Sequence, residues 1–184
     1  MDWNLFSAET LVSHQIFADG KRSFFGEIKL FRENKTFTVF IPSAKAETES
    51  LAVKKFPIHL YNFDFGSLNF AFPHLLKPQN SFTIGVIDPA FRENAPLVEY
   101  KGETVISYLN DEKRNNVSTR KYRIDGAGLQ NRGGYIWVNK KLFRIEDMEI
   151  QLPDNPEWTS FKLKLLKVEK INRTEWNKFM KAQF

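Results

Sequence analysis

The sequence predicts a mainly β protein in which an antiparallel curved sheet forms a barrel or half-barrel, followed by a short C-terminal amphipathic helix. Stretches in which apolar and polar residues alternate recur from end to end, and Gly, Asn, Asp and Pro separate them. About ten such strands, joined mostly by tight turns, form a sheet that must curl to bury its apolar face. At 184 residues the chain can bury one sizeable core, so we predict a single β-barrel-like domain over residues 1–184.

The first predicted strands cover residues 10–17, 23–31 and 36–41. Asp19-Gly20 lies between the first two, and this dipeptide tolerates the positive φ angles of a tight hairpin turn. The next segment, 43–55, is polar, Ala-rich and short of β-branched residues, so it predicts a loop or a helical turn.

The aromatic stretch YNFDFGSLNFAF, at 61–72, is predicted to be a bulged strand. Its apolar residues occupy odd positions before Gly66 and even positions after Ser67. A strand has a side-chain period of two, so one extra residue at Gly66 would keep both halves on one inward face. That face, with Trp137 from a later strand, supplies the predicted ligand-binding residues: Tyr61, Phe63, Phe65, Leu68, Phe70, Phe72 and Trp137.

Strands are predicted again over 81–87, 97–101, 103–109, 120–130, 133–139, 142–152 and 160–171. Lys101-Gly102 predicts a second hairpin between two of them. In the segment 172–184 the apolar residues change from the two-residue spacing of a strand to the spacing of a helix. Asn172 and Glu175 have the spacing of a helix capping box, and Trp176, Phe179 and Met180 follow at the spacing of one helical face. We expect this helix to dock against the sheet through these apolar residues.

Composition excludes several classes of protein. The chain has no Cys, which removes disulfides, thiolate catalysis and thiolate metal sites. No stretch approaches the roughly 20 apolar residues that a membrane-spanning helix needs. The net charge of +5 suits contact with nucleic acid, phospholipid headgroups or glycans. The basic residues are spread out, with mild concentrations over 113–123 and 162–170, and each group is interpreted as a solvated face.

The histidines, acids and glycine-rich run of the sequence do not have the spacing of a known catalytic, metal or nucleotide site. His14, His59 and His74 lie far apart, and the nucleophile-elbow, P-loop and zinc-protease motifs are absent. The Gly-rich run 125–134 precedes a strand rather than a helix, which argues against dinucleotide binding. Asp147 and Glu149 share a strand face, as neighbouring surface acids commonly do. The sequence therefore predicts no enzyme, no metal site and no cofactor.

Three stretches together resemble a known type of protein: FPIHLYNFDFGSLNF at 56–70, KYRIDGAGLQNRGGYIWVN at 121–139 and MEIQLPDNPEWTSFKLKLLKV at 148–168. They resemble uncharacterised bacterial cell-envelope proteins of unknown function, whose curved sheet is similar to that of periplasmic lipoprotein carriers. The resemblance implies a half-closed sheet around an apolar cavity for acyl chains, with a helix or loop as lid. It brings no catalytic or binding signature. The G-x-W expected on the first strand of a lipocalin is absent, as is an N-terminal Cys for lipid attachment.

The predicted function is non-enzymatic binding of an apolar or amphipathic ligand, such as a lipid or acyl chain, by the concave aromatic face. That face could equally be packed core, because a small closed barrel fills its interior with side chains. The alternative is a structural or assembly module that binds a protein or anionic polymer through its basic surface; nucleic acid is not the expected partner. We expect a periplasmic or cell-envelope location with a signal peptide trimmed away, and the cytoplasm stays open.

Overall fold

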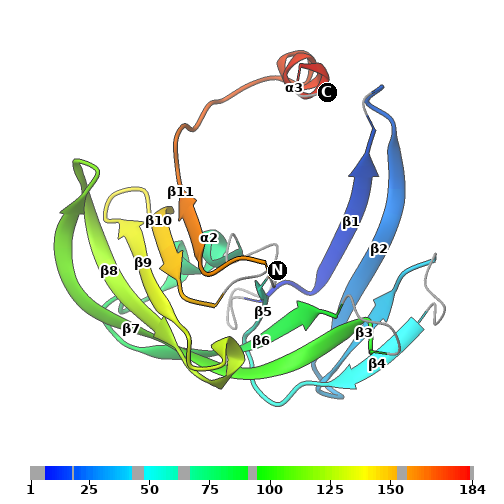
Figure 1. Cartoon of the computed structure of the whole chain (residues 1–184), viewed down its shortest axis with the longest axis horizontal. Coiled ribbons are helices and arrows are strands. Elements are labelled where there is room, and N and C mark those ends of the chain that lie inside the picture. Colours follow the sequence, from blue (N-terminus) through cyan, green and yellow to red (C-terminus); the bar gives the residue numbers. More distant parts are fainter. Residues whose placement is uncertain are drawn as a thin grey trace.

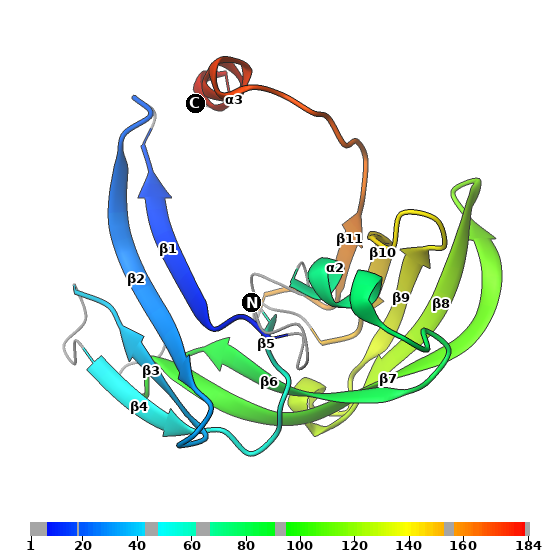
Figure 2. The same cartoon turned by 180° about the vertical axis from the view of Figure 1, so that it is seen from behind.

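The structure, a computed structural model, is mainly β, as predicted. It describes residues 7–17, 19–42, 48–61, 67–90, 95–152 and 157–182. Within these residues the strands form an antiparallel sheet of four strands and a mixed sheet of seven. The larger sheet curls into a half-barrel, and the smaller one rises beside it (Figures 1 and 2).

The smaller sheet has the strand order β1-β2-β3-β4, and each neighbouring pair is antiparallel. Its strands are β1 (Thr10–Ile16), β2 (Arg22–Phe31), β3 (Thr36–Phe40) and β4 (Thr48–Ala52). The predicted hairpin is confirmed: β1 pairs with β2, and Gly20 has a φ of 80° in the connection. The loop or helical turn predicted for 43–55 is wrong where β4 lies, because the free edge of β3 supplies hydrogen-bond partners for a segment of weak strand propensity.

The larger sheet has the order β11-β10-β9-β8-β7-β6-β5. Its strands are β5 (Ile58–Leu60), β6 (Phe82–Pro89), β7 (Val98–Arg114), β8 (Val117–Asp125), β9 (Gly134–Asn139), β10 (Ile145–Ile150) and β11 (Phe161–Lys164). The pair β5–β6 is parallel and the other pairs are antiparallel, so the sheet is mixed rather than purely antiparallel. A short 3₁₀ helix, η3 (Ala127–Leu129), lies between β8 and β9.

The second predicted hairpin is wrong, because β7 runs unbroken for 17 residues. Val86 pairs with Gly102 and Ile87 pairs with Tyr100, which leaves Lys101 as the extra residue of a bulge. Gly102 has a φ of 127°, a conformation that glycine adopts readily. The chain reverses instead at Asn115-Asn116, whose φ angles of 51° and 64° suit a tight hairpin turn.

Two apolar clusters hold the molecule together. The first fills the curl of the larger sheet beneath α2 (Leu68–Ala71) and the 3₁₀ helix η2 (Phe72–His74), with Tyr122, Ile136 and Met148 at its centre. The second joins the two sheets, and Phe37 from β3 packs there with Ile87 and Val98 from the larger sheet.

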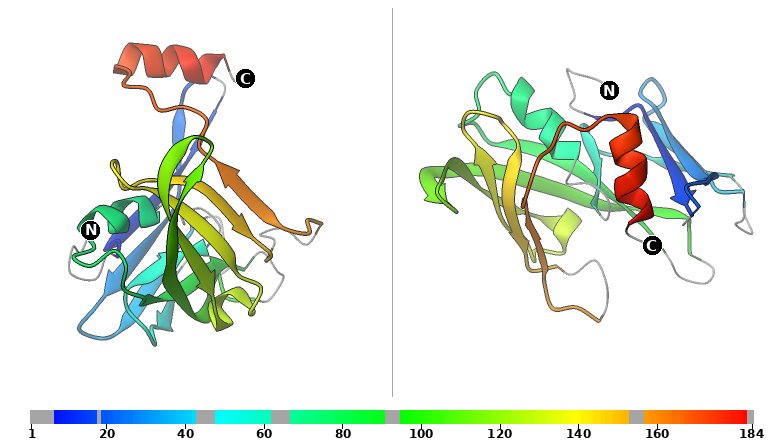
Figure 3. Two further views of the ribbon diagram at one scale, coloured as in Figure 1. Left: turned by 90° about the vertical axis from the view of Figure 1, so that its left-hand side faces the viewer. Right: turned by 90° about the horizontal axis from the view of Figure 1, so that it is seen from above.

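The C-terminal helix α3 (Arg173–Lys181) forms with the predicted capping box, in which Asn172 Oδ1 accepts from Glu175 N at 3.0 Å. Its predicted docking is wrong, because no residue of the helix is buried. A stretch without strand pairing, 166–172, connects it to β11, and the helix stands away from both sheets (Figure 3).

Candidate functional site

The described residues of the aromatic stretch at 61–72, which are Tyr61 and 67–72, do not form the predicted strand. Among its described residues, Leu68–Ala71 form α2 and Phe72 begins η2. Leu68 and Phe72 are 0% and 2% exposed, whereas Phe70 is 57% exposed. The inward orientation predicted for Phe70 is therefore wrong, because a helical period of 3.6 turns it away from the side that its neighbours bury. Phe63, Phe65 and Gly66 lie outside the described residues.

The inward-facing members of this set lie in packed core. The ring of Phe72 lies 5.2 Å from that of Tyr122, and the hydroxyl of Tyr61 donates to the carbonyl of Leu152. Leu68 belongs to the same cluster. These contacts explain their burial without a ligand, and their role in ligand binding stays a prediction.

Trp137 lies on the opposite face of the larger sheet from its neighbours Ile136 and Val138, which face the core. Its indole nitrogen donates to Glu112 Oε1 at 2.6 Å, and the guanidinium carbon of Arg114 lies 4.1 Å above its ring. The side chain is 3% exposed. Charged residues therefore cover Trp137, and it offers no open surface to an apolar ligand.

The two acids that share a face of β10, Asp147 and Glu149, belong to the same charged cluster. Arg114 Nε donates to Asp147 Oδ2 at 2.8 Å, and Arg114 Nη2 donates to Glu149. The hydrogen bond from Trp137, followed by that from Asn110, lowers the pKa of the Glu112 carboxyl. Each carboxylate is bound to a donor on the sheet, which is the arrangement of a structural ion-pair network rather than of a catalytic pair.

An apolar groove of about 420 Å³ opens where the two sheets meet. The hairpin of β1 and β2 rises away from the larger sheet at this place (Figure 1). The lining comes from β1, β2, β3, β5, β6, β7 and adjoining residues, and is formed by Leu11, Val12, Ser13, Phe25, Gly26, Glu27, Ile28, Val39, Ile41, Leu60, Pro89, Leu97 and Val98. Several of these residues also belong to the second apolar cluster, so the groove is an opening into core that faces solvent.

A bulge in β2 places an aromatic ring in this groove. Ser13 pairs with Gly26 and His14 pairs with Phe24, which leaves Phe25 as the extra residue. A bulge of this kind turns the side chain of the inserted residue away from the regular alternation. Phe25 lines the groove and is 45% exposed, whereas Phe24, outside the groove lining, stacks with Phe40 at 5.9 Å.

Sequence reasoning missed the groove. The signal that could have found the bulge is SFFGE at 23–27, where two adjacent aromatics and a glycine interrupt the alternation of β2. Gly26 is needed at this place, since a Cβ would lie 2.9 Å from the carbonyl oxygen of Phe40.

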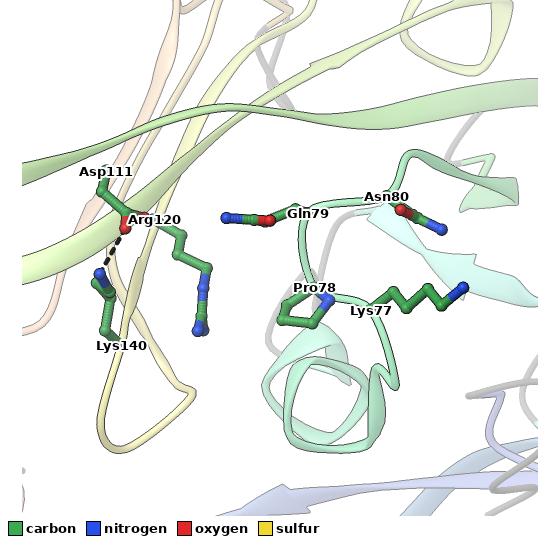
Figure 4. A pocket seen from close by; sticks show the side chains of 7 residues that line it. All are labelled: Lys77, Pro78, Gln79, Asn80, Asp111, Arg120 and Lys140. Atoms are coloured by element: carbon green, nitrogen blue, oxygen red, sulfur yellow. Dashed lines mark hydrogen bonds and ion pairs between the residues drawn. The ribbon is translucent and has the colours of Figure 1, made fainter.

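A second pocket, of about 430 Å³, is polar. It is lined by Lys77, Pro78, Gln79, Asn80, Asp111, Arg120 and Lys140 (Figure 4). The Tyr122 hydroxyl donates to the Pro78 carbonyl at 2.6 Å and holds one wall in place. On the other wall, Lys140 pairs with Asp111 at 2.5 Å, and this hydrogen bond lowers the pKa of the Asp111 carboxyl. The pocket has the wrong polarity for an acyl chain.

The buried His59 contacts a serine hydroxyl, as the general base of a serine nucleophile does, but its pKa is too low for that role. His59 Nδ1 lies 2.6 Å from Ser67 Oγ, and burial lowers the pKa of His59 to about 4. A general base works best with a pKa near the working pH, so this imidazole is poorly suited to that role at neutral pH. Within the described ranges, no group of three or more His, Asp or Glu side chains is placed to hold a metal ion.

In comparisons with protein families, with curated proteins and with solved structures, nothing matches this chain. Among the helices of the described segments, none has the length and apolar character needed to cross a bilayer. The groove between the two sheets is thus the feature on which a function can be argued.

Proposed function

We propose that the protein is a non-enzymatic binding protein for an apolar or amphipathic ligand of the lipid or acyl-chain class, held in the groove between the two sheets. The observation that carries the proposal is the lining itself, in which aliphatic side chains and Phe25 surround an open space. A volume of about 420 Å³ falls within the roughly 300 to 1,000 Å³ typical of small-molecule sites.

The chemistry of the lining favours a hydrocarbon chain. Burying one methylene contributes about 0.8 kcal/mol, so about ten methylenes contribute about 8 kcal/mol before the entropy lost on binding is subtracted. Glu27 is the charged residue of the described lining, and it is already paired with Lys29 at 2.8 Å. An acyl chain would therefore lie in the groove with its polar headgroup toward solvent.

The proposal keeps the ligand class predicted from the sequence and changes its place. The resemblance to lipoprotein carriers implied an acyl site inside the curl of the sheet, whereas α2 and η2 and the core cluster occupy the described part of that space. A periplasmic or cell-envelope location belongs to the proposal, since lipid ligands are abundant there.

Two neighbouring phenylalanines supply a matched test. Phe25→Asp introduces a charge at the groove, and we expect binding of a fluorescent long-chain fatty acid to weaken at least about tenfold, because the charge must be desolvated against the hydrocarbon. Phe24→Asp places the same charge at a residue of similar exposure, 42%, outside the groove lining, and should leave binding within about twofold.

Equal loss in both variants, or no saturable binding by the folded wild type, would contradict the proposal. Phe70→Asp is a second control, since the exposed position of Phe70 on α2 predicts no effect on binding. Urea unfolding of each variant separates loss of the groove from loss of the fold.

A further inference from the structure

The net charge of the protein is concentrated in its C-terminal segment. Residues 161–182 contain seven Lys or Arg and two Glu, a net charge of +5 that equals the net charge of the whole chain. The remaining residues carry equal numbers of acidic and basic side chains. The basic character of the protein therefore belongs to one segment, which is here called the basic tail.

The basic tail also exposes apolar side chains. Leu166 is 87% exposed, and Val168 and Ile171 are exposed beside it between β11 and α3. No residue of α3 is buried. Solvent-exposed aliphatic and aromatic side chains gathered in one segment indicate a surface that is covered by a partner.

The helix α3 separates its apolar and basic residues. Trp176, Phe179 and Met180 lie at i, i+3 and i+4, and the first two rings stack with centroids 5.7 Å apart. Lys178 and Lys181 are exposed and point away from this face by the helical period. A short helix with aromatic residues on one side and lysines on the other is typical of a segment that lies in a membrane interface.

The helix α3 has exposed residues on both of its faces, with Trp176 and Phe179 38% and 51% exposed. The last backbone hydrogen bond between the tail and the larger sheet runs from Leu165 N to Glu146 O at 3.0 Å. Beyond it the chain has no strand pairing until α3, and the helix stands clear of both sheets (Figures 1 and 3).

We propose that the basic tail binds the surface of an anionic phospholipid membrane, with Trp176 and Phe179 among the acyl chains and the lysines at the headgroups. Charge complementarity alone would also fit a nucleic acid. The exposed Leu166, Val168 and Ile171 favour the membrane, because aliphatic side chains gain free energy in acyl chains and have no stacking partner on a nucleic acid. This interaction does not depend on what the groove binds.

The test is co-sedimentation of the full chain with phosphatidylcholine vesicles, with or without about one third phosphatidylglycerol. We expect binding to the anionic vesicles to exceed binding to the neutral ones at least about tenfold, and to fall between about 0.1 M and about 1 M salt. Joint Lys178→Glu and Lys181→Glu should weaken anionic binding at least about tenfold.

Matched controls separate the tail from net charge. Joint Lys54→Glu and Lys113→Glu change the net charge by the same amount at exposed lysines outside the tail, and should leave binding within about twofold. Joint Trp176→Gln and Phe179→Gln keep the charge and should still weaken binding at least about tenfold, because the apolar face is lost.

Three outcomes would overturn the proposal. They are a wild type that stays in solution with anionic vesicles, a control pair that weakens binding as much as the tail pair, and an aromatic variant that binds vesicles as well as the wild type. Binding to a single-stranded RNA oligonucleotide, without vesicle binding, would assign the tail to nucleic acid instead. Far-ultraviolet circular dichroism and the thermal midpoint confirm that each variant is folded.

Discussion

The guanidinium carbon of Arg114 lies 4.1 Å above the centroid of the Trp137 ring, while its nitrogens bind Asp147 and Glu149. One side chain, at the end of β7, thus covers an indole of β9 and neutralises two carboxylates of β10. The side chain of Asp147 is almost fully buried, so the removal of Arg114 would leave a carboxylate that is poorly hydrated and has lost its cation.

Arg114→Ala is therefore expected to lower the free energy of unfolding by about 2 kcal/mol. Arg114→Lys should recover part of the loss, since it restores the charge without the planar fork that reaches both carboxylates. Urea unfolding at neutral pH measures both. Lys113→Ala, at the exposed neighbouring position, is the control, and an equal effect there would contradict a special role for Arg114.

His59 should make the protein less stable in mild acid. Burial lowers the pKa of its imidazole to about 4, below the ordinary value near 6.5, so the unfolded chain binds this proton more readily than the folded protein does. The contribution of the neutral ring is complete above about pH 6.5 and is lost progressively as the pH falls to about 4, by roughly 3 kcal/mol.

The measurement is urea unfolding at about pH 7 and about pH 4.5. His59→Asn removes the titrating group and should flatten this part of the profile, while its amide can still bond to Ser67. A variant that loses as much stability on acidification as the wild type would show that carboxylates, rather than His59, control the effect.

Trp176→Ala should change the free energy of unfolding by less than about 0.5 kcal/mol, because no residue of α3 is buried. Phe72→Ala should cost about 3 to 5 kcal/mol, because its ring is buried against Tyr122. Thermal or urea unfolding of the two variants side by side checks the contrast. A clear loss of stability for Trp176→Ala would mean that the helix is docked in solution.

Gly134 is the first residue of β9 and pairs with Ile150 of β10, at a place where no side chain fits. A Cβ at this position would lie 1.9 Å from the carbonyl oxygen of Glu149, so Gly134→Ala must push β9 and β10 apart and should cost about 3 kcal/mol. Gly20→Ala has open space around the Cβ and loses only the favourable backbone of its positive φ, about 1 kcal/mol. Similar unfolding midpoints for the two variants would contradict the steric argument.

Strands with a clear period of two, such as β3, were predicted correctly. The helix α3 was predicted because its signal is local, consisting of a capping box and one apolar face. The strand predicted for 61–72 is wrong over 68–72, because short apolar runs fit a strand and a buried helix about equally well. At 68–72 the helix buries Leu68 and Phe72 while it exposes Phe70, a choice that depends on the sheet beneath it.

The sequence by itself determined the β class, the first hairpin and the C-terminal helix, because alternation, turn residues and capping act within a few residues of one another. Only the tertiary structure decided that β4 pairs with β3, that Lys101 forms a bulge rather than a turn, and that α3 stays undocked. The groove, too, was decided only by the tertiary structure. It exists because one hairpin diverges from the larger sheet, and the separation of two sheets depends on packing between residues far apart in the chain, such as Val39 and Val98.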